Sequence, residues 1–454
     1  MRRVRQLAEQ TPESRERFVD LLRAVAITAV VLGHWLVIDI GYDRHGQLTG
    51  HSALSELPWA RPVTWLVQVM PVFFLVGGFA NAASLTRHQR GGGDATGWLL
   101  HRSVRLIRPT TILLVTLAAG GLIARLLGAA PQRIHLVVWF ASIPLWFLAA
   151  YLAMVLLTPV MYPLHRRFGV AVPLLLVALV ALGDLARLRG STGDLGGFAA
   201  GNYLFGWLAV HQAGFAWEDG RLPAKRRVGV PLLLVGVAGL LLLTLAGPYP
   251  VSMINVPGER IHNTAPPSLA LLALAIAQLG LILLLRGPAD RWLRRPRPWR
   301  LVVAANSVVL TIFLWHISAV LLLIGGLDLV GLLPTAPVGS TAWLLWRLPW
   351  LLMLLLVLSP LVAIFARFET HGAPHPTGPP RWLPARLAGA LARPGPRAAL
   401  TAAGFTATVV GLAGNAMAPK HAAYLFGIPT GALIAYLLGA LVLRLLRSVP
   451  EHRP

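Results

Sequence analysis

The sequence predicts an all-α, polytopic transmembrane protein, and three observations support this fold class. Of the 454 residues, 56% are hydrophobic and only 13% are charged, whereas soluble globular proteins have about 25% charged residues. Apolar stretches near the roughly 20 residues that a helix needs to cross a bilayer recur from Val19 to Leu446. Lys and Arg lie between these stretches and favour alternate loops. The composition therefore excludes a soluble enzyme.

Apolar length and the positions of Pro, Gly and Arg predict twelve transmembrane helices. Those before the longest outer loop are expected at 19–40, 62–86, 106–128, 134–162, 168–186, 197–216 and 228–247. Those after it are expected at 268–285, 301–325, 341–366, 398–417 and 422–446. The segment 134–162 is long enough to be a tilted helix. Because the first apolar run lacks a small-residue cleavage site, we expect the first helix to be retained.

The positions of Lys and Arg predict the orientation of the chain. Of these 40 residues, 31 lie in the N-terminal segment, the alternate loops and the tail, and nine lie in the opposite loops. By the positive-inside rule, both termini are expected in the cytoplasm. The net charge of +23 then reflects orientation and contact with a lipid bilayer, and we expect no nucleic-acid partner.

Composition also divides the chain into segments. A cytoplasmic N-terminal segment (1–18) precedes a transmembrane core (19–367), and repeated Pro and Gly predict a flexible cytoplasmic linker over 368–397. Two additional helices are expected within 398–446, followed by a cytoplasmic tail (447–454). The sequence has no Cys, which excludes disulfides and thiolate chemistry. It also shows no clustered metal ligands, Gly-rich phosphate loop or nucleophilic-serine elbow.

Two ionisable residues of the first helix are the leading candidates for chemistry. Arg23 and His34 are 11 residues apart, which is three helical turns with an offset of about 20° and a rise of about 16 Å. They therefore share one helix face. An arginine can bind phosphates, and a histidine can accept a proton near neutral pH. Alternatively, Arg23 is an interfacial anchor and His34 a packing residue. Asp20, three residues before Arg23, is placed to pair with it.

Further candidates lie on later helices, and each has a structural alternative. Arg102, Arg105 and Arg108 recur every third residue and suit a polyphosphate, although positive-inside anchoring would also place them there. The adjacent glycines Gly77 and Gly78 allow close approach of a helix or a ligand. Trp146 and His316 lie in apolar helices, where a packing role is favoured.

Together these motifs resemble the acyltransferase 3 family of bacterial integral-membrane O-acyltransferases. The resemblance spans about 18–367. Its most specific element is the first-helix pattern of Asp, Arg and, after ten intervening residues, His, which matches Asp20, Arg23 and His34. The other matching segments are Phe73–Phe79, with Gly77 in place of the usual serine, Arg105 and Arg108 or Arg102 and Arg105 before Pro109, Leu145–Leu148 and Leu314–His316.

The resemblance implies a ten-helix core in a bacterial inner (plasma) membrane. It implies acyl-CoA, often acetyl-CoA, as co-substrate, no tightly bound cofactor or metal, and transfer of the acyl group to a hydroxyl of a carbohydrate, glycolipid or secreted metabolite. On this basis Arg23 and the arginines of 102–108 would hold CoA, His34 would be the general base, and His316 would line the acceptor side.

Two other classes fit the predicted helices: a multi-pass secondary transporter of a small polar or amphipathic solute, and a non-catalytic scaffold. The interior carboxylates are few, with Asp39 and Asp184 near span ends, which disfavours proton-coupled transport.

Overall fold

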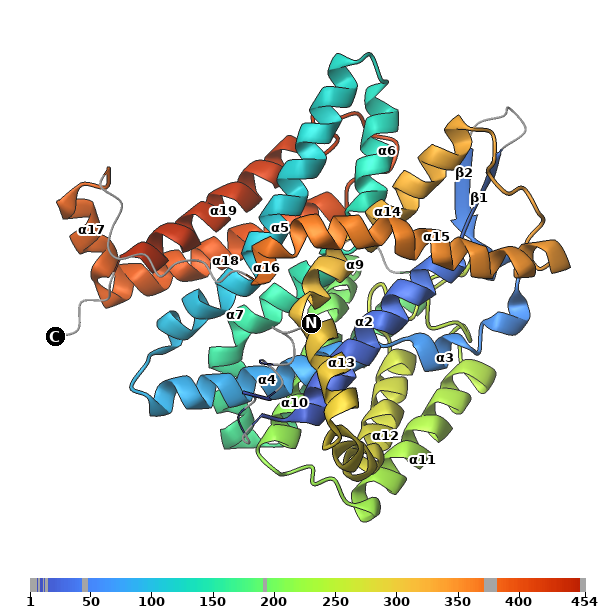
Figure 1. Ribbon diagram of the computed structural model, residues 1–454. Coiled ribbons are helices and arrows are strands. Elements are labelled where there is room, and N and C mark those ends of the chain that lie inside the picture. The colour runs from blue at the N-terminus through green and yellow to red at the C-terminus, as the bar shows by residue number, and fades with distance from the viewer. Residues whose placement is uncertain are drawn as a thin grey trace. The chain divides into compact units, whose positions relative to one another are not determined.

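The computed structural model describes residues 15–42, 48–190, 194–370 and 382–449, together with residues 6, 9, 10 and 12. Its regular structure is almost entirely helical (Figure 1), which confirms the all-α fold class. Within the described residues, 11 helices are long and apolar enough to cross a membrane. The chain is therefore a multi-pass membrane protein.

The chain divides into two compact units. Unit 1 comprises Met1–Ala83, Val160–Val309 and Leu327–Leu354, and unit 2 comprises Ser84–Pro159, Leu310–Gly326 and Leu355–Pro454. The divisions between the units fall inside four helices: α4 (Met70–Arg90), α7 (Leu145–Phe168), α14 (Val309–Leu329) and α15 (Thr341–Phe365).

Unit 1 begins with α2 (Arg17–Val37), a continuous helix that contains no Pro. An antiparallel hairpin follows directly, in which β1 (Ile38–Tyr42) pairs with β2 (Leu48–Ser52). The remaining elements that lie wholly within unit 1 are η1 (Ala53–Ser55), η2 (Pro58–Ala60), α3 (Thr64–Val67), α8 (Ala171–Leu188), α9 (Asp194–Ala200), α10 (Asn202–Glu218), α11 (Arg226–Leu241), η3 (Leu242–Ala246), α12 (Leu269–Leu293) and α13 (Pro296–Ser307). Helices α11 and α12 pack side by side (Figure 1). Helix α8 packs against α10.

The loop between η3 and α12 is held by a buried carboxylate. Asp184 of α8 accepts hydrogen bonds from the Tyr249 hydroxyl (2.9 Å), the Leu269 amide (2.8 Å) and the Arg187 guanidinium (3.1 Å). Arg187 also donates to the His262 carbonyl at 2.8 Å. Burial, together with the charge and hydrogen bonding of Asp184, raises the pKa of Tyr249. The loop is thus fixed at several points along its length.

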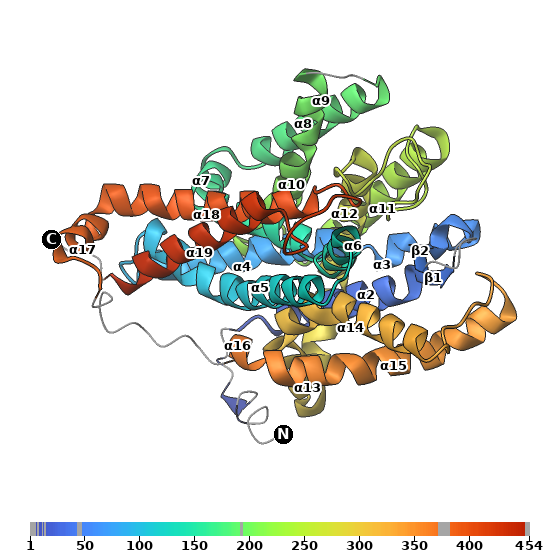
Figure 2. The ribbon, with the colours of Figure 1, turned by 90° about the horizontal axis from the view of Figure 1, so that it is seen from above.

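Unit 2 contains α5 (Ala95–Leu126), α6 (Pro131–Ala141), α16 (Arg367–Thr370), α17 (Ala385–Ala392), α18 (Pro394–Ala416) and α19 (Thr430–Ser448). Helices α18 and α19 pack along each other and against α5 (Figure 2). The buried Tyr436 hydroxyl of α19 donates to the Ile107 carbonyl (3.0 Å) and contacts the Thr111 hydroxyl (2.9 Å). His135 of α6 bonds the carbonyls of Pro419 and Gly427 at 3.0 and 2.8 Å.

Three expected spans differ from the observed helices. The segment 134–162 forms two helices, α6 and α7, because Pro144 lacks an amide donor and disfavours helical backbone at the residue before it. The segment 301–325 is divided at Val308 into α13 and α14. The segment 197–216 is interrupted at Gly201, and α10 has only 17 residues, so it is shorter than the 11 candidate spans.

Candidate functional site

In unit 1, α2 carries three of the candidate residues. Asp20 and Arg23 lie in its first two turns, and His34 lies in its last turn. The continuous helix preserves the predicted geometry, with Arg23 and His34 on one face and about 16 Å apart along the axis. His34 is closer to the end of the helix than the expected span of 19–40 implied, because the chain enters strand β1 at Ile38.

The predicted pairing of Asp20 with Arg23 is confirmed, but Asp20 has a second cationic partner. The Asp20 carboxylate accepts from Arg23 Nη1 at 3.0 Å and from Arg15 Nε at 2.6 Å. Its side chain is buried, whereas Arg15 and Arg23 are 47% and 33% exposed. The side chain of Asn306 donates to the Asp20 backbone carbonyl at 2.8 Å. One buried carboxylate thus orients two guanidinium groups, which together carry one more charge than it neutralises.

The surroundings of His34 are fixed by backbone contacts at the end of α2. The Ile38 amide donates to the His34 carbonyl, and the indole Nε1 of Trp350 donates to the Trp35 carbonyl at 3.1 Å. His34 is half-buried, and its neighbour Trp35 is fully buried. The last turn of α2 is therefore anchored to α15.

Helix α4 contains Gly77 and Gly78, and both residues are buried. A Cβ at Gly78 would overlap the backbone carbonyl oxygen of His211 and lie 3.1 Å from the Cα of Gly214. Beside this contact, Asn81 Nδ2 and His211 Nε2 are 3.1 Å apart. At Gly78 the close approach is therefore to helix α10, one of the two possibilities that the sequence left open.

In unit 2, three candidate residues are linked to Phe147 of α7: Trp146 directly, His316 through Phe313 and Arg102 through Tyr151. Trp146 precedes it, and Phe313 of α14 meets it edge to face, with ring centroids 5.4 Å apart. His316, one turn after Phe313, is fully buried, and its Nδ1 lies 2.6 Å from the Phe313 carbonyl. The Phe147 ring also stacks on Tyr151. The Tyr151 hydroxyl accepts from Arg102 Nη2 at 3.5 Å.

The three arginines of α5 have different neighbours. Arg102 lies beside Tyr151 and over the Trp98 ring, at 5.8 Å from its centroid. Arg108 lies over the ring of Phe368 in α16 at 5.9 Å. Arg105 is exposed, and its positive charge interacts electrostatically with the carboxylate of Glu369. The stripe therefore spans the helix surface between α7 and α16.

Glu369 closes the amino end of α14. Its carboxylate accepts from the amides of Leu310 and Thr311 at 3.1 and 2.8 Å, and from the Thr311 hydroxyl at 2.6 Å. The carboxylate thereby binds amides that the first turn of a helix leaves without intrahelical partners. In the described part of the chain, no group of three or more His, Asp and Glu residues could hold a metal ion.

Several residues of these arrangements were missed at the level of sequence: Arg15, Tyr151, Phe368 and Glu369. Arg15 precedes Asp20 by five residues, a separation that does not indicate pairing because Arg15 lies outside the helix. Tyr151 follows Phe147 by one helical turn, and this spacing was the available signal. Phe368 and Glu369 lie where the sequence predicted the start of a flexible linker.

These features define a helical, multi-pass membrane protein that carries Asp20, Arg23 and His34 on its first spanning helix. Residues 16–368 match the acyltransferase 3 family, described as an acyltransferase domain. The chain belongs to this family, as its motifs predicted, and is a membrane acyltransferase. Neither curated proteins nor solved structures give a match.

Proposed function

We propose that the protein is an O-acyltransferase of the bacterial inner membrane, with both termini in the cytoplasm. It takes an acyl group, acetyl in the simplest case, from acyl-CoA. It transfers this group to a hydroxyl of a carbohydrate, glycolipid or secreted metabolite. The observation that carries the proposal is the placement of Arg23 and His34 on one face of the continuous helix α2. Acyl-CoA has a matching shape, with anionic phosphates at one end of a long thin arm and the thioester at the other.

On this proposal the phosphates of CoA bind at the amino end of α2. Arg15 and Arg23 share the single carboxylate of Asp20, so positive charge remains available for an anion. On the family resemblance, Arg102, Arg105 and Arg108 of α5 are also assigned to CoA. Arginine suits this role because its planar guanidinium can bind phosphate through two hydrogen bonds at once.

His34 acts as the general base. It accepts the proton of the acceptor hydroxyl as the hydroxyl oxygen attacks the thioester carbonyl carbon. A C–O bond forms and the C–S bond breaks. The proton then passes from His34 to the departing thiolate, so that the products are an acyl ester and free CoA. On the family resemblance, Gly77, Gly78 and Trp146 have supporting roles in helix packing, and His316 is assigned to the acceptor side.

The first experiment measures thiol release from acetyl-CoA by the protein in lipid, with a glycan and glycolipid extract as acceptor. His34→Ala should lower the rate by about 10²–10⁴-fold, the range for loss of a general base. The matched control is His421→Ala, which removes an exposed histidine of the loop between α18 and α19. Full activity in His34→Ala would refute the proposed base. Movement of a labelled solute without release of thiol would instead identify a transporter.

A second experiment separates the two ends of the donor. S-acetyl-N-acetylcysteamine keeps the thioester but has no phosphates. Arg23→Ala should lower kcat/KM for acetyl-CoA by about 10–100-fold, since hydrogen bonds to charged groups are worth roughly 1.5–3 kcal/mol. It should leave kcat/KM for the short donor unchanged, whereas His34→Ala should impair both. Arg291→Ala, at an exposed arginine near the end of α12, controls for general loss of positive charge. Equal losses with both donors in Arg23→Ala would contradict phosphate binding.

A third experiment tests the acceptor-side residue. His316→Ala should alter the rate or the KM for the acceptor, and retention of both would remove His316 from the site.

A further inference from the structure

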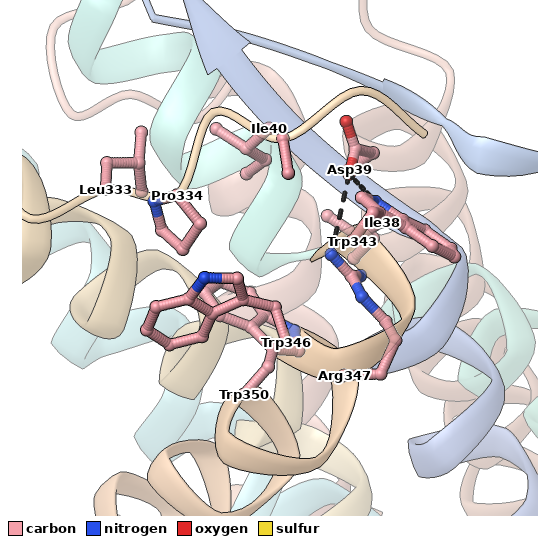
Figure 3. A pocket seen from close by; sticks show the side chains of 10 residues that line it. Ile38, Asp39, Ile40, Leu333, Pro334, Trp343, Trp346, Arg347 and Trp350 are labelled. Carbon is pink, nitrogen blue, oxygen red and sulfur yellow. Dashed lines mark hydrogen bonds and ion pairs between the residues drawn. The ribbon is translucent and has the colours of Figure 1, made fainter. Parts of the chain in front are cut away.

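A small pocket lies in unit 1, directly after α2 (Figure 3). It is lined by strand β1, by the segment 333–336 and by the first turns of α15. Its volume is about 370 Å³, including the part that is open to solvent. Because most of this space is open to solvent, the pocket is shallow, and a ring bound here lies across its mouth rather than inside it.

One wall of the pocket is a polar cluster. The Asp39 carboxylate accepts from the indole Nε1 of Trp343 at 2.6 Å and pairs with Arg347 Nη2 at 3.6 Å. The Arg347 guanidinium lies over the Trp343 ring, 4.1 Å from its centroid. Arg347 Nε and Nη1 are buried and have no hydrogen-bond partner among the residues that the structure describes. Because a buried donor without an acceptor is costly, the cluster is incomplete as it stands.

The other wall is aromatic. Trp343, Trp346 and Trp350 occupy the first, fourth and eighth positions of one stretch of α15, so they share a helix face with Arg347. Trp343 and Trp350 are each 6% exposed, whereas Trp346 is 39% exposed. In Figure 3 the Trp346 side chain lies below Pro334 and to the left of Arg347. Tryptophans of a membrane-interface belt lie at the headgroup level. Here Trp343 instead donates to Asp39, and Trp350 donates to the Trp35 carbonyl.

The pocket is connected to the candidate catalytic helix. Asp39 follows His34 by five residues, and Ile38, which also lines the pocket, donates its amide to the His34 carbonyl. Trp350 donates to the carbonyl of Trp35, the residue after His34. A molecule bound here lies next to the end of α2 that carries His34 and at the opposite end from Arg23.

We infer that this pocket is the acceptor subsite and that it binds one uncharged pyranose ring. The C–H face of such a ring packs against an exposed indole, as Trp346 offers. The ring hydroxyls donate to Asp39, and their oxygens accept from Arg347. The formal charges of Asp39 and Arg347 cancel, which favours an uncharged ring over a carboxylated or amino sugar. The assignment of this pocket to the acceptor rests on the proposed function. The binding of a sugar ring in the pocket is tested without catalysis.

The test is saturation-transfer NMR with the full-length protein in lipid nanodiscs and no acyl donor. The probes are the methyl pyranosides of glucose, galactose, mannose and rhamnose, with methyl glucuronoside and methyl glucosaminide as charged comparisons. At least one neutral glycoside should bind, with a Kd in the millimolar range. Trp346→Ala should weaken this binding at least tenfold. Trp292→Ala, which removes a similarly exposed tryptophan of α12 (45% exposed), should not change it.

Asp39→Asn provides a second variant, since an asparagine oxygen can still accept from Trp343 while the charge is lost. It should also weaken binding of the neutral glycoside at least tenfold. The inference is overturned if no neutral glycoside binds, if Trp346→Ala binds as tightly as wild type, or if a charged glycoside binds ten times more tightly than every neutral one.

Failure of the pocket and failure of the proposed function give different results. If thiol release depends on His34 but Trp346→Ala changes neither glycoside binding nor the KM for the acceptor, only the pocket assignment falls. If glycosides bind in a Trp346-dependent way but no acceptor supports thiol release, the pocket stands as a carbohydrate site and the proposed reaction falls.

Discussion

Replacing Gly78 with Ala should destabilise unit 1, although alanine is the better helix former. An added Cβ would overlap the His211 carbonyl oxygen and lie 3.0 Å from its carbon and 3.1 Å from Gly214 Cα, whereas ordinary contacts begin near 3.4 Å. All three are backbone atoms, so α4 and α10 must move apart. Such overpacking typically costs about 1–3 kcal/mol. Separation of the helices also weakens the contact between Asn81 and His211, worth about 0.5–1.5 kcal/mol.

The gain in helix propensity offsets only part of this cost, since Ala is favoured over Gly by about 0.5–1 kcal/mol in a helix. The expected result is a net loss of about 1–3 kcal/mol in the free energy of unfolding. The assay is denaturant unfolding in detergent micelles, followed by tryptophan fluorescence. Gly120→Ala in α5 is the control, because apart from its chain neighbours and the nearby backbone of its own helix, no atom of the described residues lies within 4 Å of its added Cβ. A Gly78→Ala protein as stable as Gly120→Ala would refute the packing argument.

Three further predictions concern hydrogen bonds outside this contact. Tyr436→Phe removes the bonds to Ile107 and Thr111 and should lower the unfolding free energy by about 1–2 kcal/mol; an unchanged unfolding midpoint would contradict it. The pKa of Tyr249 is raised in the folded protein. Its contribution to the free energy of unfolding is therefore present below about pH 10 and is lost as pH rises above that value, where the tyrosine ionises in the unfolded chain. Unfolding measured between pH 9 and 11 should therefore show a loss of stability that is smaller in Tyr249→Phe, and equal slopes would refute this. Asp20→Ala leaves Arg23 without its orienting carboxylate and should raise the KM for acetyl-CoA by about 2–5-fold, as for loss of a partly exposed ion pair; an unchanged KM would argue against that orienting role.

The sequence predicted the membrane class and most spans because length and apolar content decide whether a helix can cross a bilayer. It also predicted the pairing of Asp20 with Arg23, since residues three apart on a helix are neighbours. It did not predict the division at Val308. No Pro or Gly marks this position, and the helix ends involve distant groups: Asn306 bonds Asp20, and Glu369 binds the first amides of α14.

The pocket could not be predicted because its residues are distant in sequence. Trp343, Trp346, Arg347 and Trp350 have the spacing of one helix face, which was a readable signal. Their meaning depends on Asp39, however, which is about 300 residues earlier and faces Arg347 only because the chain turns into strand β1 after α2. A single sequence contains no information about such a long-range contact.

On the proposed function, the position of His34 in the last turn of α2 shortens the path of the acceptor into the protein. If His34 lay midway along the helix, a polar acceptor would have to enter the apolar interior of the membrane, and each unsatisfied polar group would cost several kcal/mol. His34 lies four residues before β1, so on the proposed function the acceptor would stay near the pocket at the end of the helix. The flexible arm of the proposed acyl donor would then cross the distance from Arg23. This arrangement assigns the long path to the thin substrate and the short path to the hydroxylated one, which is costlier to desolvate.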